Sequence, residues 1–572
     1  MESIKCKWIY ALLVLLATGC GVIWSVTNVG YDGEYQIAMA YRLMKGDKLF
    51  LEMWEPHQTS AIFPAFLMWI YVKLFRTTTG IVLYLQICGI AIRGGIAVLL
   101  YRVLGRNLER PVAFGAALLY FMISPKDYAL PEFANMQVWF SALLFCCLLK
   151  YLEKKKRFYL ISAAVCLCCE VLAYPSCAIV LLGVVIVLWV YSENRWLDIG
   201  MFTGVCAVLG IAFAGYFLVT IGPDTFGECI SGMFALEPSH TISTTEKLLA
   251  YFKDFGKILL VLLLIGGIGY VVSRLIERVT GGKSKPENRR ELGMWLWLLC
   301  CGIILLAGFF INILDAENRY VYGIILLPFS GVGFRNRGCL TQKERQIYVC
   351  GSVIGGLGFL ATLLLTNLPL LSSVPYGLLT VISAVIPVGK KIKGISTGAL
   401  RGGCYFCGLC FIFLLAFRCV FVRTPLTGKG QICSVISGLA IVRSGPALGI
   451  ISDEAGVCIQ RDSYPEWREL IRPGDKVWVV GGVVDTLGYL YEDVEVAGPS
   501  TISTPSYNEA VLDYWRLNRE KSPDVIVAES YMGNLTDDLL RNQWLISFIE
   551  EEYQPQYVVD GTYWKFYFKE AR

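Results

Sequence analysis

Long apolar stretches recur along most of this 572-residue chain, and they constrain its fold more than any other feature. The stretches 8–26, 199–221, 258–272, 295–314 and 402–422 approach the ~20 apolar residues with which a helix crosses a bilayer. With 55% hydrophobic residues and only 17% charged ones, the composition excludes an ordinary soluble protein. The sequence therefore predicts a polytopic α-helical membrane protein.

The charged residues divide the chain into two parts. Residues 424–572 hold 13 Lys and Arg against 22 Asp and Glu, whereas residues 1–423 are basic. A basic membrane part indicates positive charge in cytoplasmic loops, so the net charge of +5 does not indicate nucleic-acid binding. We expect a transmembrane domain at 1–423 and a soluble domain at 424–572.

Loops rich in Lys and Arg alternate with loops poor in them, and the positive-inside rule places the rich loops in the cytoplasm. The rich loops are 102–110, 154–157, 274–290, 335–345 and 390–393, and the poor loops are 125–136, 174–176, 222–255, 315–319 and 367–369. The alternation requires that the apolar stretch 60–75, which contains Pro64 and Lys73, does not cross the membrane. We therefore expect about 13 spans, a cytoplasmic N-terminus, an outer loop 27–80 with a juxtamembrane helix, and an extracytoplasmic C-terminal domain.

The C-terminal part has the pattern of a small α/β domain. Residues 476–480 and 524–528 predict buried parallel strands, 507–519 and 537–552 predict helices, and 558–568 predicts a hairpin. Gly481 and Gly482 do not form a dinucleotide-binding fingerprint, so a packing or accessory role is favoured over a nucleotide site. Cys433 and Cys458 can pair as a disulfide if the domain lies outside the cytoplasm.

Two carboxylates follow the first span closely. Asp32 and Glu34 precede a segment, 38–46, that predicts a short helix. Carboxylates near the membrane surface can accept a proton from an incoming hydroxyl or hold a divalent cation (Mg, Mn or Zn) against a phosphate. The alternative is that both are solvated loop charges.

The order of these elements resembles the GT-C integral-membrane glycosyltransferases, especially the group with protein O-mannosyltransferases and lipid A aminoarabinose transferases. The resemblance rests on one helix, the motif Asp32-Gly33-Glu34, the segment 38–47, and the polar turn Glu55-Pro56-His57-Gln58-Thr59 before a juxtamembrane helix. It covers the order of elements over about the first 420 residues, with the motif confined to residues 31–60.

The resemblance implies that Asp32 activates the acceptor and that Glu34 assists or orients it. It implies a polyprenyl-phosphate donor of a hexose or pentose, transfer to a glycan, lipid or protein acceptor on the outer face, and a bacterial plasma membrane. This chain departs from the mannosyltransferases in having Asp-x-Glu rather than adjacent Asp-Glu, and Pro-His-Gln-Thr at the turn. These departures leave open which of the two carboxylates activates the acceptor and which one assists it.

Further polar residues in the outer loops are candidates for binding the donor phosphate or the acceptor. They are His57 in the polar turn, Glu132 ahead of Asp127 in the next loop, His240 and Lys247 in the loop 222–255, and Arg319. The alternatives are that the two histidines have no functional role and that Arg319 extends its side chain to the lipid headgroups. Glu170, inside an apolar run, indicates either function or pairing.

Two other function classes remain open. A transporter or flippase for a lipid-linked saccharide needs a similar membrane part, but the internal symmetry typical of transporters is not apparent in the sequence. A non-catalytic envelope assembly protein needs no carboxylates such as Asp32 and Glu34 beside the membrane.

Overall fold

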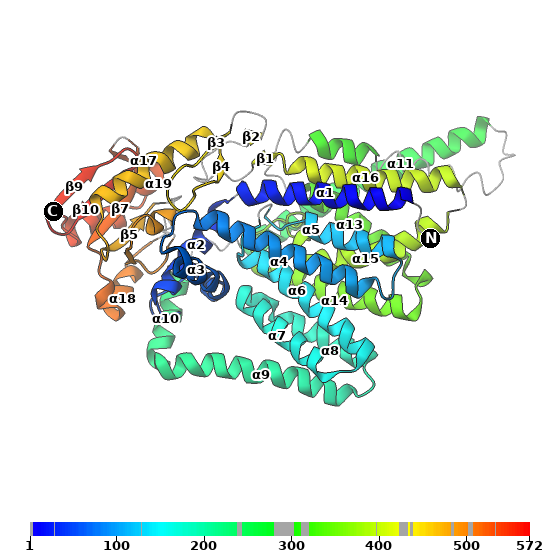
Figure 1. Ribbon diagram of the computed structural model, residues 1–572, viewed down its shortest axis with the longest axis horizontal. Coiled ribbons are helices and arrows are strands. Elements are labelled where there is room, and N and C mark those ends of the chain that lie inside the picture. Colours follow the sequence, from blue (N-terminus) through cyan, green and yellow to red (C-terminus); the bar gives the residue numbers. More distant parts are fainter. Residues whose placement is uncertain are drawn as a thin grey trace.

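The computed structural model describes residues 4–27, 29–126, 129–236, 243–279, 302–310, 320–395, 397–422, 433–434, 439–481, 486–501, 507–531 and 533–571. A helical part and a mixed C-terminal domain lie side by side along the longest axis of the molecule (Figure 1). Both parts of the predicted fold class, the polytopic helical part and the small α/β domain, are present.

The helical part follows the apolar stretches of the sequence. Its helices are α1 (Ile4–Val26), α2 (Tyr31–Lys45), α3 (Ile62–Phe75), α4 (Ile81–Leu104), α5 (Arg110–Met122), α6 (Phe133–Lys154), α7 (Arg157–Ala173), α8 (Val180–Tyr191), α9 (Arg195–Thr220), α10 (Pro223–Ala235), α11 (Thr244–Val279), α13 (Tyr320–Arg335), α14 (Gln342–Leu365), α15 (Leu378–Lys393) and α16 (Gly398–Arg418). Short 3-10 turns join them at η1 (Gln58–Ala61), η2 (Pro175–Ile179) and η5 (Val374–Gly377). Among the described residues, seven helices are long and apolar enough to cross a membrane, and three further apolar helices are shorter.

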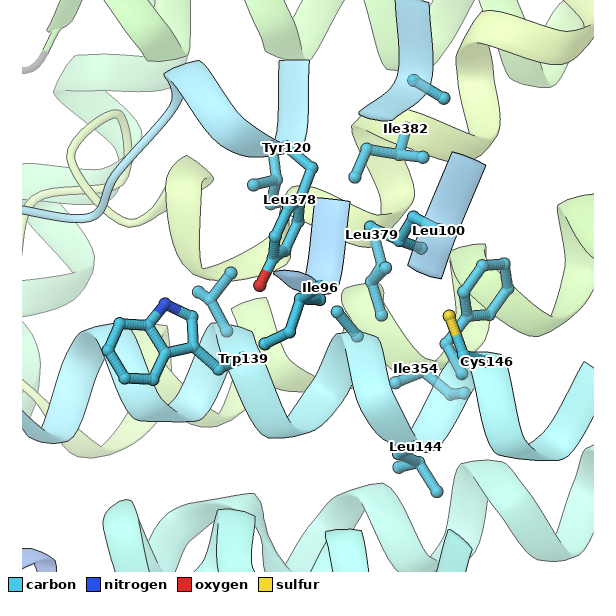
Figure 2. Packing of buried hydrophobic residues seen from close by; sticks show 14 of the residues in the cluster. Ile96, Leu100, Tyr120, Trp139, Leu144, Cys146, Ile354, Leu378, Leu379 and Ile382 are labelled. Atoms are coloured by element: carbon cyan, nitrogen blue, oxygen red, sulfur yellow. The ribbon is translucent and has the colours of Figure 1, made fainter. Parts of the chain in front are cut away.

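The helix α6 is the centre of the bundle, because 78% of its apolar window is buried. Figure 2 shows side chains of α4, α5, α14 and α15 gathered around it, among them Ile96, Tyr120, Ile354 and Leu379. By contrast, only 11% of the corresponding window of α9 is buried, so α9 presents its apolar side chains to lipid. Because α6 is packed by its neighbours on most sides, the residues of its first turn are held in a fixed position.

The stretch expected to lie on the membrane surface forms η1 and α3. Its length and composition also suit a span. Figure 1 shows α2 and α3 at the end of the bundle that faces the C-terminal domain, whereas α1, α4 and α16 run along the bundle. That this stretch lies on the membrane surface stays a prediction.

The C-terminal domain is built on a twisted sheet. Its helices are α17 (Glu454–Leu470), α18 (Ala510–Leu517), α19 (Asp537–Leu540) and α20 (Gln543–Ser547), and its strands are β1 (Phe421–Val422), β2 (Cys433–Ser434), β3 (Ala440–Ile441), β4 (Ile451–Ser452), β5 (Lys476–Val480), β6 (Glu495–Val496), β7 (Val525–Tyr531), β8 (Asn534–Leu535), β9 (Tyr557–Asp560) and β10 (Trp564–Phe568). The main sheet has the order β6-β5-β7-β10-β9, and β8 pairs with β7. The strands β5 and β7 are parallel, and β9 and β10 form an antiparallel hairpin, as the sequence predicts.

Successive residues of a strand face opposite sides of the sheet, and here each side packs against residues of the helical part. Val477 and Val479 pack in one core with Ile37 and Tyr41 of α2. Trp478 lies on the other side, in a second core that includes Trp54 of the loop between α2 and α3. The first loop is thus wedged against the domain and belongs to its hydrophobic cores.

Candidate functional site

Asp32 lies in the first turn of a helix and not in an extended loop. The helix α2 begins at Tyr31, seven residues before the predicted start, and follows Gly30, whose φ of 66° lies in the left-handed region that glycine adopts freely. A carboxylate in the first turn is stabilised by the helix dipole. The side chain of Asp32 is 49% exposed, so a substrate can reach it.

Glu34 does not share this position. It is two residues further along α2, which turns its side chain by about 200° around the helix axis. Its exposed fraction is only 2%. The two carboxylates therefore face different sides of α2 and do not form the acidic pair that the motif suggested.

A lysine joins Asp32 to the loop 123–132 between α5 and α6. The Lys126 ammonium nitrogen lies 2.6 Å from Oδ2 of Asp32 and 3.4 Å from Oε2 of Glu132. It also lies 3.7 Å from the centre of the Phe133 ring, an arrangement in which the ring face attracts a cation. Only 5% of the Lys126 side chain is exposed. The predicted residues Asp32 and Glu132, about 100 positions apart, are thus brought to one cation.

Glu132 is fixed at the N-terminus of α6. Its carboxylate accepts the backbone N–H groups of Ala134 at 3.0 Å and Asn135 at 2.7 Å, as a helix-capping residue does. Its side chain is fully buried. Burial raises the pKa of the Glu132 carboxyl, while Lys126 and the two N–H groups oppose this shift.

The loop that carries Lys126 and Glu132 is tied to its surroundings. Oε1 of Gln86 on α4 accepts the N–H of Ala129 at 3.2 Å, and Nδ2 of Asn135 donates to the Leu130 carbonyl at 2.9 Å. A side chain at Gly89 would place its Cβ 1.7 Å from the Ala129 carbonyl oxygen, so only glycine lets the loop lie this close to α4.

His57 lies beside the same cluster within an aromatic stack. The His57 ring is stacked on the Phe133 ring, with centroids 4.2 Å apart. The ring of Tyr174, the residue before η2, has its centroid 5.4 Å from that of His57. Burial, together with the nearby Lys126 charge, lowers the pKa of His57 to about 4, against the opposing effect of Asp32. The imidazole is therefore neutral at pH 7.

The first loop is clamped to the C-terminal domain by a buried network of ion pairs and hydrogen bonds around Arg42. Arg42, which is fully buried, pairs with Asp47 at 2.8 Å and with Glu55 at 3.0 Å. Asp47 also pairs with Lys521 at 2.7 Å, and Glu55 accepts the backbone N–H of Thr501 at 3.0 Å. Burial alone would lower the pKa of Arg42, but Glu55 and Asp47 raise it well above its ordinary value. The clamp sets the position of the turn that carries His57.

Of the remaining candidates, Lys247 has a structural contact. It lies on α11 and donates to the Leu364 carbonyl at 2.8 Å, where a lysine satisfies an orphan carbonyl at the end of α14. His240, Arg319 and Asp127 lie outside the described residues. Cys458 is a free cysteine, so its pairing with Cys433 is not present.

Glu170 has the polar partner that its burial demands. It is fully buried on α7 and accepts the Ser141 hydroxyl of α6 at 2.5 Å. The pair stabilises the contact between these two helices. It lies one turn before Tyr174, whose backbone N–H donates to the Glu170 carbonyl.

Lys126 is the functional candidate that the sequence analysis missed. The loop 125–136 is poor in Lys and Arg, and Lys126 is its single lysine. A lone cation in a loop with Glu132 and Asp127, following an acidic first loop, is the signal that could have identified it.

A divalent cation at Asp32 and Glu34 does not fit this arrangement. The two side chains face different sides of α2, and the Lys126 ammonium lies between Asp32 and Glu132. Within the described part of the chain, no group of three or more His, Cys, Asp or Glu side chains is placed to hold a metal ion.

Comparison with known proteins yields solved structures alone, since no family model matches and no curated protein is similar to this chain. The Archaeoglobus fulgidus oligosaccharyltransferase in its apo form is 12% identical over 92% of this chain and 70% of its own, with a TM-score of 0.46. The same enzyme with Zn and sulfate is 10% identical over 91% and 68%, with a TM-score of 0.44. ArnT from Cupriavidus metallidurans bound to undecaprenyl phosphate is 12% identical over 99% and 98%, with a TM-score of 0.43. At this level of likeness, a functional assignment depends on the residues of the site.

Proposed function

We propose that this protein is a GT-C type membrane glycosyltransferase that moves a sugar from a polyprenyl-phosphate donor to a cell-envelope acceptor on the outer face of the membrane. The observation that carries the proposal is the position of Asp32, a half-exposed carboxylate in the first turn of α2. The helix α2 lies where the helical bundle meets the C-terminal domain (Figure 1). A lipid carrier keeps its chain in the bilayer and its phosphate at the surface, while a polar acceptor arrives from water. A reaction between them requires a general base at this boundary.

The geometry supports a direct displacement. Asp32 accepts the proton of the acceptor hydroxyl while the acceptor oxygen attacks the anomeric carbon of the donor sugar. The bond from this carbon to the phosphate oxygen breaks, and the polyprenyl phosphate leaves with the bonding electron pair. Attack from the face opposite the phosphate inverts the configuration at the anomeric carbon.

The surroundings of Asp32 supply the rigidity that such a step needs. Lys126, in the loop before α6, pairs with the Asp32 carboxylate. Among the candidate spans of the described residues, α6 is the most buried. A base that is held in one position avoids the cost of ordering it in the transition state. Glu34 belongs to the packed side of α2, and we assign it no direct part in the proton transfer.

The test is transfer by the purified protein in liposomes. A panel of radiolabelled polyprenyl-phosphate hexoses and pentoses is offered together with envelope lipids, glycans and peptides, and labelled acceptor is counted. Asp32→Asn is expected to lower the transfer rate by about 10²- to 10⁴-fold, the usual contribution of a general base. The matched control is Asp493→Asn, which removes an exposed carboxylate from a surface pair with Lys45.

The same liposomes distinguish the other function classes. Movement of the labelled donor between leaflets with no labelled acceptor would identify a flippase and contradict the proposal. Equal transfer by the wild type and Asp32→Asn would remove Asp32 from the mechanism.

A further inference from the structure

The Lys126 ammonium is the cation that the structure places between two carboxylates. It lies 2.6 Å from Asp32 and 3.4 Å from Glu132. A divalent cation that bridged the same carboxylates would lie about 2.0–2.6 Å from their oxygens. The two cations would compete for the same oxygens and repel each other.

The lysine is held in place on several sides. The Phe133 ring lies 3.7 Å beneath its ammonium group, and only 5% of the side chain is exposed. Its loop is fixed by hydrogen bonds to Gln86 and Asn135. A surface lysine pays rotamer entropy each time it forms an ion pair, whereas this one is already ordered.

Resting on the proposed glycosyl transfer, we propose that Lys126 is a built-in cation that replaces a divalent metal at this site. It acts as a positioning residue: its ammonium orients the Asp32 carboxylate toward the acceptor hydroxyl and offsets the negative charge of Asp32 and Glu132. The displacement itself needs no oxidant, reductant or metal, since the proton passes to Asp32 and the electron pair leaves with the phosphate.

The first test measures metal dependence and metal content together. Wild-type protein purified with EDTA should transfer sugar at a rate within about twofold of its rate with added Mg²⁺, Mn²⁺ or Zn²⁺. Metal analysis by mass spectrometry should find far less than one ion per chain. Loss of transfer on chelation that Mn²⁺ restores, or one tightly bound ion per chain that Asp32→Asn removes, would overturn the proposal.

The second test removes the ammonium group. Lys126→Met should lower transfer by about 10²-fold, and millimolar Mn²⁺ should restore part of it, because the ammonium no longer competes with a metal for the two carboxylates. Electron paramagnetic resonance should show Mn²⁺ bound to Lys126→Met and not to the wild type. If Lys126→Met binds no Mn²⁺ and gains nothing from it, the lysine does not replace a metal.

Two further variants guard against a folding defect. Lys126→Met with Glu132→Gln removes both buried charges together, and it should fold and bind Mn²⁺ weakly, since only Asp32 remains. Lys45→Met is the control for loss of a lysine from an Asp pair, because Lys45 pairs with the exposed Asp493. Mn²⁺ should bind to this control no better than to the wild type.

The metal measurements do not depend on turnover. If the wild-type protein transfers no sugar from any donor, the proposed function fails, and the Mn²⁺ spectra still decide whether Lys126 occupies a cation site. If transfer occurs and requires a metal, the proposed function stands and the built-in cation fails.

Discussion

The buried network around Arg42 provides a quantitative test of how the C-terminal domain holds the first loop. Arg42→Met keeps the approximate length of the side chain and removes its charge. Asp47 keeps its contact with Lys521 at 2.7 Å, but Glu55 keeps only the backbone N–H of Thr501. Glu55 is fully buried, so the variant leaves a buried carboxylate without its counter-charge.

Removing one partner of a buried pair costs about 3–5 kcal/mol. Because 1.36 kcal/mol corresponds to a factor of ten, the local opening of the loop should become about 10²- to 5 × 10³-fold more frequent. Hydrogen exchange of peptides from residues 46–57 and 507–521, measured in detergent, reports this opening directly. The double variant Arg42→Met with Glu55→Gln should recover part of the loss, since it removes the uncompensated charge as well.

The control is Arg106→Met at an exposed pair. Arg106 lies 3.3 Å from Glu153, and both side chains are well exposed, so its loss should cost about 0–1 kcal/mol. If Arg42→Met changes the exchange of residues 46–57 no more than this control does, the ion pairs do not hold the loop.

Other predictions concern the loop beside Asp32 and the neutral imidazole. Gly89→Ala should lower transfer strongly, because its Cβ would meet the Ala129 carbonyl oxygen, whereas Gly95→Ala on the same helix has open space and should leave transfer unchanged; equal rates would show that the loop adapts. Because the folded-state pKa of His57 is lowered to about 4, the unfolded chain binds more protons between pH 6.5 and 4, and stability should fall across this range by about 2–3 kcal/mol. The melting temperature of His57→Gln should depend less on pH than that of the wild type, and an identical dependence would argue that His57 is solvated.

Apolar patterning predicted several helices of the membrane part, whereas of the about 13 expected spans the described residues hold seven candidates and three shorter apolar helices. The stretches 8–26 and 402–422 correspond to α1 and α16, since a span is determined by its own composition. The strands β5 and β7 were likewise predicted, because buried parallel strands are continuous apolar runs. The helix α17 was missed, as it is polar and contains Pro465, which normally ends a helix.

The site was predicted only in part, because it is assembled from distant segments. Asp32, His57 and Glu132 stood out by residue type and motif, and the structure brings them together around Lys126. The start of α2 at Tyr31 could not be predicted from a segment with no side-chain cap, and this start turns Glu34 away from Asp32. The clamp around Arg42 joins residues more than 450 positions apart, and no local pattern reports such a contact.

The most direct test of the central claim is the chemical step at Asp32, separated from donor binding. Purified wild type and Asp32→Asn, each in excess over a radiolabelled polyprenyl-phosphate sugar, are mixed with acceptor, and loss of label from the lipid is followed over a single turnover. Donor binding is measured in parallel. If Asp32 is the general base, Asp32→Asn should bind the donor as tightly as the wild type does. Its rate of sugar transfer should be lowered by about 10²-fold or more. A variant that binds the donor and releases its sugar at the wild-type rate would contradict the proposed role of Asp32.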